Sequence, residues 1–154
     1  METERKYFSF RAIVEKLVIT MLGEMIGELT GKVTCQRIIR CHSKDLKLER
    51  TLEMKGKILG MDVTFIATTK SWERAQGGMF SDGNGVLMTM KGEKAILHGS
   101  GVSVAMNGPA ASIRGVRYAQ SASPSLSRLN NVAIPFEIEI KADGTVYDKW
   151  WEWK

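Results

Sequence analysis

The sequence predicts an all-β protein: an eight-stranded antiparallel up-and-down barrel after one N-terminal helix. From residue 31 onward, apolar and polar residues alternate with a period of two, in runs separated by tight turns. No segment between these runs is long enough for the helical crossover that parallel strands need. Glycines recur inside the runs between residues 79 and 120, and glycine within a strand marks the bends and close approaches that curl a sheet. Closure removes exposed edges; a two-layer β-sandwich is the alternative.

The chain fits a single domain over residues 1–154, with the helix at 8–28 and the barrel at 31–153. Hydrophobic residues make up 44% and charged residues 25%, values typical of a soluble globular protein. The net charge of +5 is spread among acidic residues instead of forming a basic stripe interleaved with aromatics. We therefore expect a solvated surface of mixed charge and no nucleic-acid partner.

Residues 8–28 place their apolar side chains on one broad arc of a helical wheel, with Lys16, Thr20 and Glu24 opposite. An amphipathic membrane or partner helix is one interpretation, and a helix packed on the barrel is the other. For the C-terminal part of the segment, near Leu29, a strand is the alternative to a helix. The apolar run is short and carries charges, which argues against a membrane span. Its polar face also lacks the Lys/Arg enrichment of surface-binding helices, so we expect packing and no membrane insertion.

The first half of the barrel reads as three strands. The first covers residues 33–40 and has mixed faces, and the second places four apolar residues on one side. A turn at Lys55-Gly56-Lys57 leads into a long third strand that continues to Trp72, before a turn at residues 76–78. The apolar side of the second strand consists of Leu46, Leu48, Leu52 and Met54.

Three more strands fill residues 79–120, with turns at 91–93 and 106–109. Ser123 followed by Pro124 predicts a capped helical turn over 124–130 that closes one end. Residues 132–141 alternate without a fault, and Asp143-Gly144 is a hairpin signal before the strand 145–153.

The aromatic C-terminal strand divides into two faces. We expect Tyr147, Trp151 and Trp153 to face the core. Trp150 then lies on the opposite face, against the N-terminal helix or a second subunit. An exposed apolar face of this kind predicts a homo-oligomer.

Several kinds of chemistry lack the residues they need. Cys35 and Cys41 stand at the two ends of one strand, too far apart for a disulfide. The charged N-terminus resembles no secretory signal. We therefore expect a cytoplasmic protein. His42 and His98 stand in no metal-ligand spacing, so we expect no metal. The sequence also contains no nucleophile elbow and no phosphate-binding loop, so we expect no cofactor.

The strand at residues 110–120 carries Arg114 on one face and Arg117 on the other, so closure turns one arginine inward. His98 shares a face with aliphatic residues of the preceding strand, Tyr118 shares the Arg114 face, and Asp62 lies opposite an apolar face. These five residues are the predicted ligand site of a mainly apolar interior. The alternative is an internal arginine pair that only satisfies the core. Inward glycines and alanines are expected to leave space for a ligand.

Residues 31–153 resemble the calycin-like barrels, and among them the allene-oxide-cyclase-like group. The resemblance rests on the hairpin order and on the strand starts Gly-Asn-Gly-Val at 83–86 and Gly-Ser-Gly-Val at 99–102. It implies a central cavity and the binding or isomerisation of small hydrophobic molecules. No catalytic motif of the group is present, so no active-site residue is carried over. The segments SIRGVRYAQSASPSLSRLN and WEWK are similar to those of uncharacterised microbial proteins.

Three functions are compatible with the sequence. The first is a barrel that binds a small hydrophobic or amphipathic ligand, with a carboxylate or carbonyl met by Arg114 or Arg117 and hydrogen bonds from Tyr118 and His98. The second is a cofactor-free isomerase or cyclase that acts by positioning an apolar substrate. The third is a structural or oligomer-assembly domain with a filled core.

Overall fold

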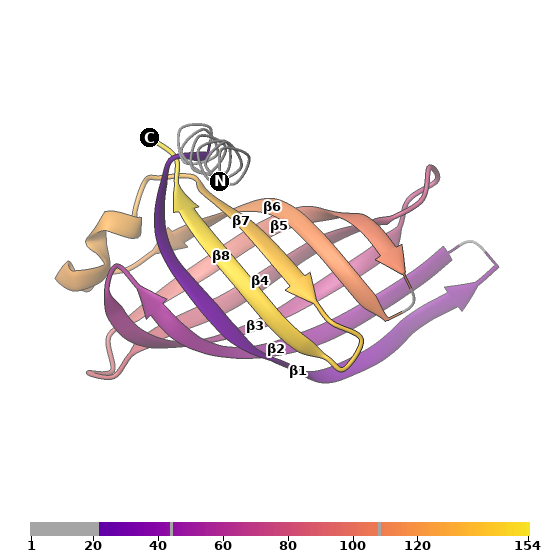
Figure 1. The fold of residues 1–154 in the computed structure, drawn as a ribbon, viewed down its shortest axis with the longest axis horizontal. Helices are drawn as coiled ribbons and strands as arrows, with labels where there is room; N and C mark the ends of the chain where they lie inside the picture. The colour runs from indigo at the N-terminus through magenta and orange to yellow at the C-terminus, as the bar shows by residue number, and fades with distance from the viewer. Residues whose placement is uncertain (1–21, 44, 108) are drawn as a thin grey trace, which may run out of the picture.

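Eight antiparallel strands follow one another around a closed barrel in the computed structural model, which describes residues 22–43, 45–107 and 109–154 (Figure 1). Each strand pairs with the next along the chain, and β8 pairs with β1 to close the ring. The predicted up-and-down barrel is therefore confirmed, and the sandwich alternative is wrong. The strands are β1 Glu24–His42, β2 Asp45–Ile58, β3 Met61–Glu73, β4 Met79–Thr89, β5 Lys94–Asn107, β6 Ala110–Gln120, β7 Ile134–Ile140 and β8 Thr145–Glu152, with a 3-10 helix η1 at Pro124–Leu129.

Alternation along the strands sends every second side chain into one core, except in β1 from Thr34 to His42, where every side chain is exposed. β7 is the clearest case, because all four of its isoleucine and phenylalanine side chains are buried, as its alternation predicts. The same holds for the apolar side of β2 from Leu48 to Ile58. Burying this apolar surface is the main contribution to the stability of the barrel.

The predicted helix at 8–28 is wrong for residues 24–28, which form the start of β1, and residues 8–21 lie outside the described part. Glu28 pairs with Lys57 of β2 and with Lys149 of β8. A register shift between Met25 and Gly27 marks a bulge, and the buried Ile26 and Leu29 lie on either side of Gly27. The bulge separates two inward residues by three positions. This spacing is also typical of a helix, so the sequence pattern predicted a helix here.

The turn predicted at Lys55-Gly56-Lys57 is also wrong. β2 continues to Ile58, and the chain reverses at Leu59 and Gly60, which have φ values of 51° and 76°. Gly56 lies within the strand instead, where a Cβ would approach the Glu28 carbonyl oxygen to 2.1 Å. Glycine is needed there for the close approach of β1 and not for a turn.

The faces of β8 are reversed from the prediction. Trp150 pairs with the inward-facing Phe136 and packs edge-on to Phe65, with ring centroids 5.2 Å apart. Tyr147 and Trp153 are exposed, while Trp151 is buried. Because both faces of this strand are aromatic, hydrophobicity alone did not fix its orientation. The proposed apolar surface at Trp150, on which the expected homo-oligomer rested, is part of the core.

The two ends of the barrel differ. At one end η1 inserts Leu126 and Leu129 into the core, which confirms the predicted closing turn, although the Ser123 side chain forms no capping hydrogen bond (Figure 1). At the other end the β1–β8 pairing stops at Lys32, and β1 continues to His42 paired with β2 alone. The barrel wall is therefore shortest at the β7–β8 turn, away from η1.

Within the described residues, no helix is long and apolar enough to cross a bilayer. Cys35 and Cys41 are exposed and carry free thiols. Within residues 22–43, 45–107 and 109–154, no three histidine, cysteine or carboxylate side chains gather as metal ligands do.

Candidate functional site

The barrel interior receives only one of the two arginines of β6. Arg117 points inward and is buried, as the prediction of one inward arginine requires. Arg114 points outward, so its expected place in an interior site is wrong. Its guanidinium lies 3.1 Å from the Glu137 carboxylate and 2.9 Å from that of Glu139, both on β7. These carboxylates already neutralise Arg114 at the surface.

His98, Tyr118 and Asp62 were also predicted to line the interior, and all three lie on the outer wall. His98 and Tyr118 stand opposite each other across β5 and β6 and border a surface groove of about 570 Å³. His98 Nε2 lies 3.1 Å from the Asp82 carboxylate, and Asp62 accepts a hydrogen bond from Lys57 at 2.8 Å. Their strand parity is opposite to that of the buried residues, which excludes them from an interior site.

Arg117 forms a buried ion pair in the middle of the barrel. Its Nη1 and Nη2 groups donate to the two Asp148 carboxylate oxygens at 2.9 and 3.2 Å. The guanidinium carbon lies 4.0 Å from the ring centroid of Phe136 and 4.4 Å from that of Trp150. Bidentate pairing and stacking on aromatic faces are the contacts for which arginine is best suited. The pair matches the structural alternative in the sequence analysis, an internal arginine with its own carboxylate.

Burial dominates the electrostatics of this pair. It raises the pKa of Asp148, and the charge and hydrogen bonds of Arg117 oppose that shift. Burial likewise lowers the pKa of Arg117, against the charge of Asp148. The indole N–H of Trp150 lies near the Asp148 carboxylate and lowers its pKa slightly in favour of the charged form. The Nε1 atom nevertheless forms no hydrogen bond of good geometry within the described residues.

The inward glycines and alanines of β5 and β6 were expected to leave a hollow, but the space beside Gly99, like that beside Gly85 on β4, is filled. A Cβ at Gly85 would lie 2.4 Å from the Phe65 ring. A Cβ at Gly99 would lie 2.7 Å from the Cβ of Arg117. Each glycine therefore makes room for a large side chain of the neighbouring strand, and the interior stays densely packed.

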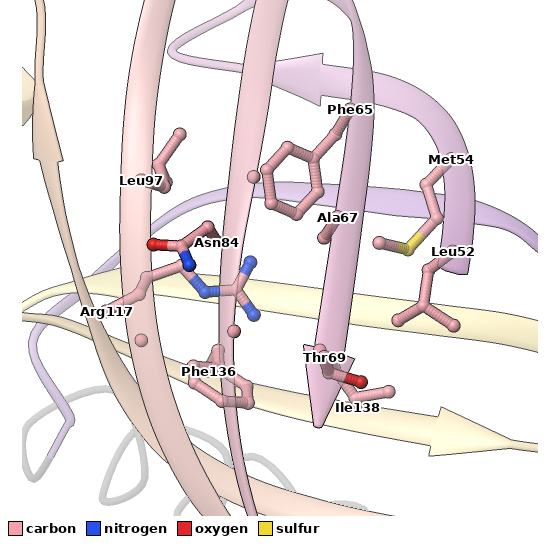
Figure 2. Close-up of a pocket in the computed structure, with 13 residues that line it drawn as sticks. Leu52, Met54, Phe65, Ala67, Thr69, Asn84, Leu97, Arg117, Phe136 and Ile138 are labelled. Atoms are coloured by element: carbon pink, nitrogen blue, oxygen red, sulfur yellow. The ribbon is translucent and has the colours of Figure 1, made fainter. Parts of the chain in front are cut away.

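Two small adjoining cavities remain in the interior, with volumes of about 50 and 40 Å³. Figure 2 shows the first, in which the Arg117 guanidinium points among apolar side chains. Typical sites for drug-sized ligands measure about 300–1,000 Å³. The cavities therefore suit a group of a few heavy atoms. Residues that line both are Leu52, Thr69, Gly83, Gly99, Phe136 and Ile138.

Arg50 is a buried interior residue that the sequence analysis missed. It lies on the inward face of β2 between Leu48 and Leu52, and it borders the second cavity. Only 8% of its surface is exposed. Its Nε donates to Gln36 Oε1 at 2.6 Å. The available signal was an arginine that interrupts an otherwise apolar face of period two.

Hydroxyl groups surround Arg50 on the same inner wall. Thr69 stands opposite Arg50 in the β2–β3 register, and Ser71 and Ser81 share a hydrogen bond of 2.7 Å between β3 and β4. All three line the second cavity. Burial lowers the pKa of Arg50, and no carboxylate opposes that shift among the described residues. This polar patch combines a positive charge with donors and lies toward the end away from η1.

Comparisons with known proteins show the fold of the chain but not its activity. No protein-family model matches the chain, and no curated protein matches it. A solved protein of unknown function from Clostridium acetobutylicum aligns with a TM-score of 0.73 at 12% identity, covering 84% of this chain and 96% of its own. A "beta-barrel like protein" from Acinetobacter baumannii aligns at 0.70 and 10% identity, with 85% and 94% covered.

An enzyme from Penicillium herquei is a more distant structural neighbour, with a TM-score of 0.58, 16% identity, and coverage of 82% of this chain and 91% of its own. At these identities the similarities show a shared barrel fold alone. The chain therefore shares its β-barrel fold with these solved proteins, one of which is described as having unknown function. The narrower resemblance to calycin-like and allene-oxide-cyclase-like barrels stays a prediction.

Proposed function

We propose that the protein is a binding barrel for a small, largely apolar molecule held in its two interior cavities. The observation that carries this proposal is their shared lining, which is mostly apolar but contains arginine at two places. An apolar wall with a few convergent polar groups is typical of small-molecule sites. Arg50 borders the second cavity and Arg117 the first.

Size restricts the ligand class. A molecule of four to eight heavy atoms is of the order that the cavities accommodate with small side-chain movements. Since Leu126 and Leu129 fill the η1 end, access is expected at the opposite end, near the short β7–β8 turn. Met54 lines the first cavity, and its unbranched side chain adapts to irregular volumes more easily than a branched one.

The isomerase alternative has less support. It acts by positioning an apolar substrate but still needs His98, Tyr118 or a carboxylate to project into the cavity, whereas His98 and Tyr118 lie on the outer wall. Asp82 borders the second cavity, but its carboxylate pairs with His98. The Penicillium herquei neighbour is described as an enzyme, and the similarity to it extends to the fold only. The structural-domain alternative fits the small cavity volumes, and a binding measurement separates it from the proposal.

We also propose that the chain self-associates, through exposed side chains of the outer wall and not through the buried Trp150. Ile96 on β5 and Tyr118 on β6 are large side chains that are each more than half exposed and border the same outer groove. A second copy of the chain would cover such side chains favourably. Sedimentation of the full chain at several concentrations gives the subunit number directly. A monomer at every concentration contradicts the proposed self-association.

The binding proposal is tested with xenon and 1-butanol as neutral probes, following the ¹³C-methyl resonances of Leu52 and Met54. Saturable shifts of both methyls are expected in the wild type. Ala67→Ile fills the first cavity and should abolish the shift of Met54, which lines that cavity alone, while Thr68→Ile places the same side chain at the adjacent outward position and should preserve it. Absence of saturable shifts in the wild type, or persistence of the Met54 shift in folded Ala67→Ile, contradicts the proposal and favours a filled structural barrel.

A further inference from the structure

We infer that the molecule bound inside the barrel is a small organic acid whose carboxylate is held by Arg50. This inference rests on the proposed function and adds the chemical class of the ligand. The two buried arginines differ in their partners. Arg117 has a dedicated carboxylate in Asp148, whereas Arg50 is paired with no carboxylate among the described residues.

The charge of Arg50 is compensated only in part. Its Nε bonds to the neutral amide oxygen of Gln36, and its two Nη groups form no hydrogen bond within the described residues. Glu49, the residue before Arg50 in the strand, points to the outside and forms an ion pair with Arg37 at 2.7 Å. A buried charge without a counter-charge is costly, so proteins normally pair it or use it to bind an ion. The unused Nη pair has the fork geometry that suits two carboxylate oxygens.

The groups beside Arg50 are also suited to an anion. In the bond between Ser71 and Ser81 one hydroxyl donates, which leaves the proton of the other free. Thr69 adds a third hydroxyl directly opposite Arg50. Hydroxyl donors beside a guanidinium stabilise an anion without adding competing negative charge.

The position of Arg50 also indicates how the ligand lies. Arg50 pairs with Gln36 of β1, and Gln36 lies beyond Lys32, the last β1 residue that pairs with β8. The guanidinium therefore lies toward the end of the barrel away from η1, where access is expected. From there the shared lining around Phe136 leads inward to the first cavity. The carboxylate is therefore placed near the opening and the apolar body deeper in the barrel. The cavity volumes favour short-chain monocarboxylates over nucleotides or long-chain fatty acids.

The test compares butyrate with 1-butanol, which have similar apolar chains and differ in charge. Both are titrated into the full-length protein in a buffer free of carboxylates and phosphate, again following the Leu52 and Met54 methyls. Wild type is expected to bind butyrate about tenfold to a hundredfold more tightly than 1-butanol, as a charge-assisted pair contributes. Arg50→Met should remove this preference by weakening butyrate binding far more than it changes 1-butanol binding.

The outcomes separate this inference from the proposed function. If 1-butanol binds but butyrate binds no more tightly, the acid class is wrong and the binding barrel stands. If neither probe binds, both are wrong. If Arg50→Met retains the preference for butyrate, Arg50 is not the receptor. Should Arg50→Met fail to fold, Ser71→Ala provides the second variant: a fall in butyrate affinity larger than any change in 1-butanol affinity supports the site, and a butyrate preference equal to that of the wild type contradicts it.

Discussion

Replacement of Asp148 by asparagine should strongly destabilise the barrel. The side chains have nearly the same shape, so the change removes the charge and leaves the Arg117 guanidinium buried with a neutral partner. The Asp148 side chain is 0% exposed and that of Arg117 is 6% exposed, so solvent screens neither. Breaking a buried pair by removing one partner typically costs about 3–5 kcal/mol.

That cost is large for a single domain. Total unfolding free energies are about 5–15 kcal/mol, and a domain of this length loses about 2–4 °C of Tm per kcal/mol. We therefore expect Tm to fall by about 6–20 °C. The double variant Arg117→Met/Asp148→Leu removes both charges and fills the space with apolar atoms. It should be more stable than Asp148→Asn, because replacing a buried pair with packed hydrophobic residues is often neutral or favourable.

The assay is urea unfolding at pH 7 followed by tryptophan fluorescence, which reports on the pair because Trp150 lies beside it. Arg114→Met is the control, since its exposed pairs contribute only about 0.2–1 kcal/mol. A loss below about 1 kcal/mol for Asp148→Asn would refute the reasoning. So would a double variant no more stable than Asp148→Asn, because the cost would then not come from an unpaired charge.

Three further perturbations test the packing and the electrostatics. Gly85→Ala should cost about 1–3 kcal/mol through its clash with the Phe65 ring, and adding Phe65→Leu should recover part of this loss in thermal unfolding. Leu126→Ala should cost about 2–5 kcal/mol, because its side chain is fully buried; a loss near zero would show that η1 does not close the core. Hydrogen bonding to Arg128 is the main cause that lowers the pKa of Glu152 from its usual 4.5, so the stabilisation is present above that pH and lost as pH falls through the lowered pKa. The Tm difference between wild type and Glu152→Gln should therefore shrink from pH 7 to pH 3, and a constant difference would contradict the assignment.

The order and closure of the strands could be predicted because hairpin signals and period-two alternation are local properties of the sequence. β7 and the Asp143-Gly144 turn show this most clearly: Gly144 adopts the expected positive φ of 82°, and Thr145 N–H donates to the Asp143 carboxylate. The start of β1 could not be predicted, because its bulge produces helix-like spacing and the pairing with β8 depends on residues far along the chain.

The candidate site was harder to predict because it depends on which face of each strand turns inward. β6 carries an arginine on each face, and only the closed barrel decides that Arg117 is inside. The glycines were misread for a related reason. A missing side chain at Gly99 indicates a space, but only the structure shows that Arg117 fills it. Arg50 went unnoticed because it breaks the apolar pattern that defined its strand.

The most direct test of a barrel that binds a small acid is an intermolecular NOE measurement on the full-length protein with butyrate. The account predicts NOEs from the butyrate chain to the methyl groups of Leu52, Met54 and Ile138, which line the interior cavities. Contacts to Ile96 and Val132, which border the outer groove, with none to the interior methyls would contradict it, as would the absence of any NOE at saturating butyrate.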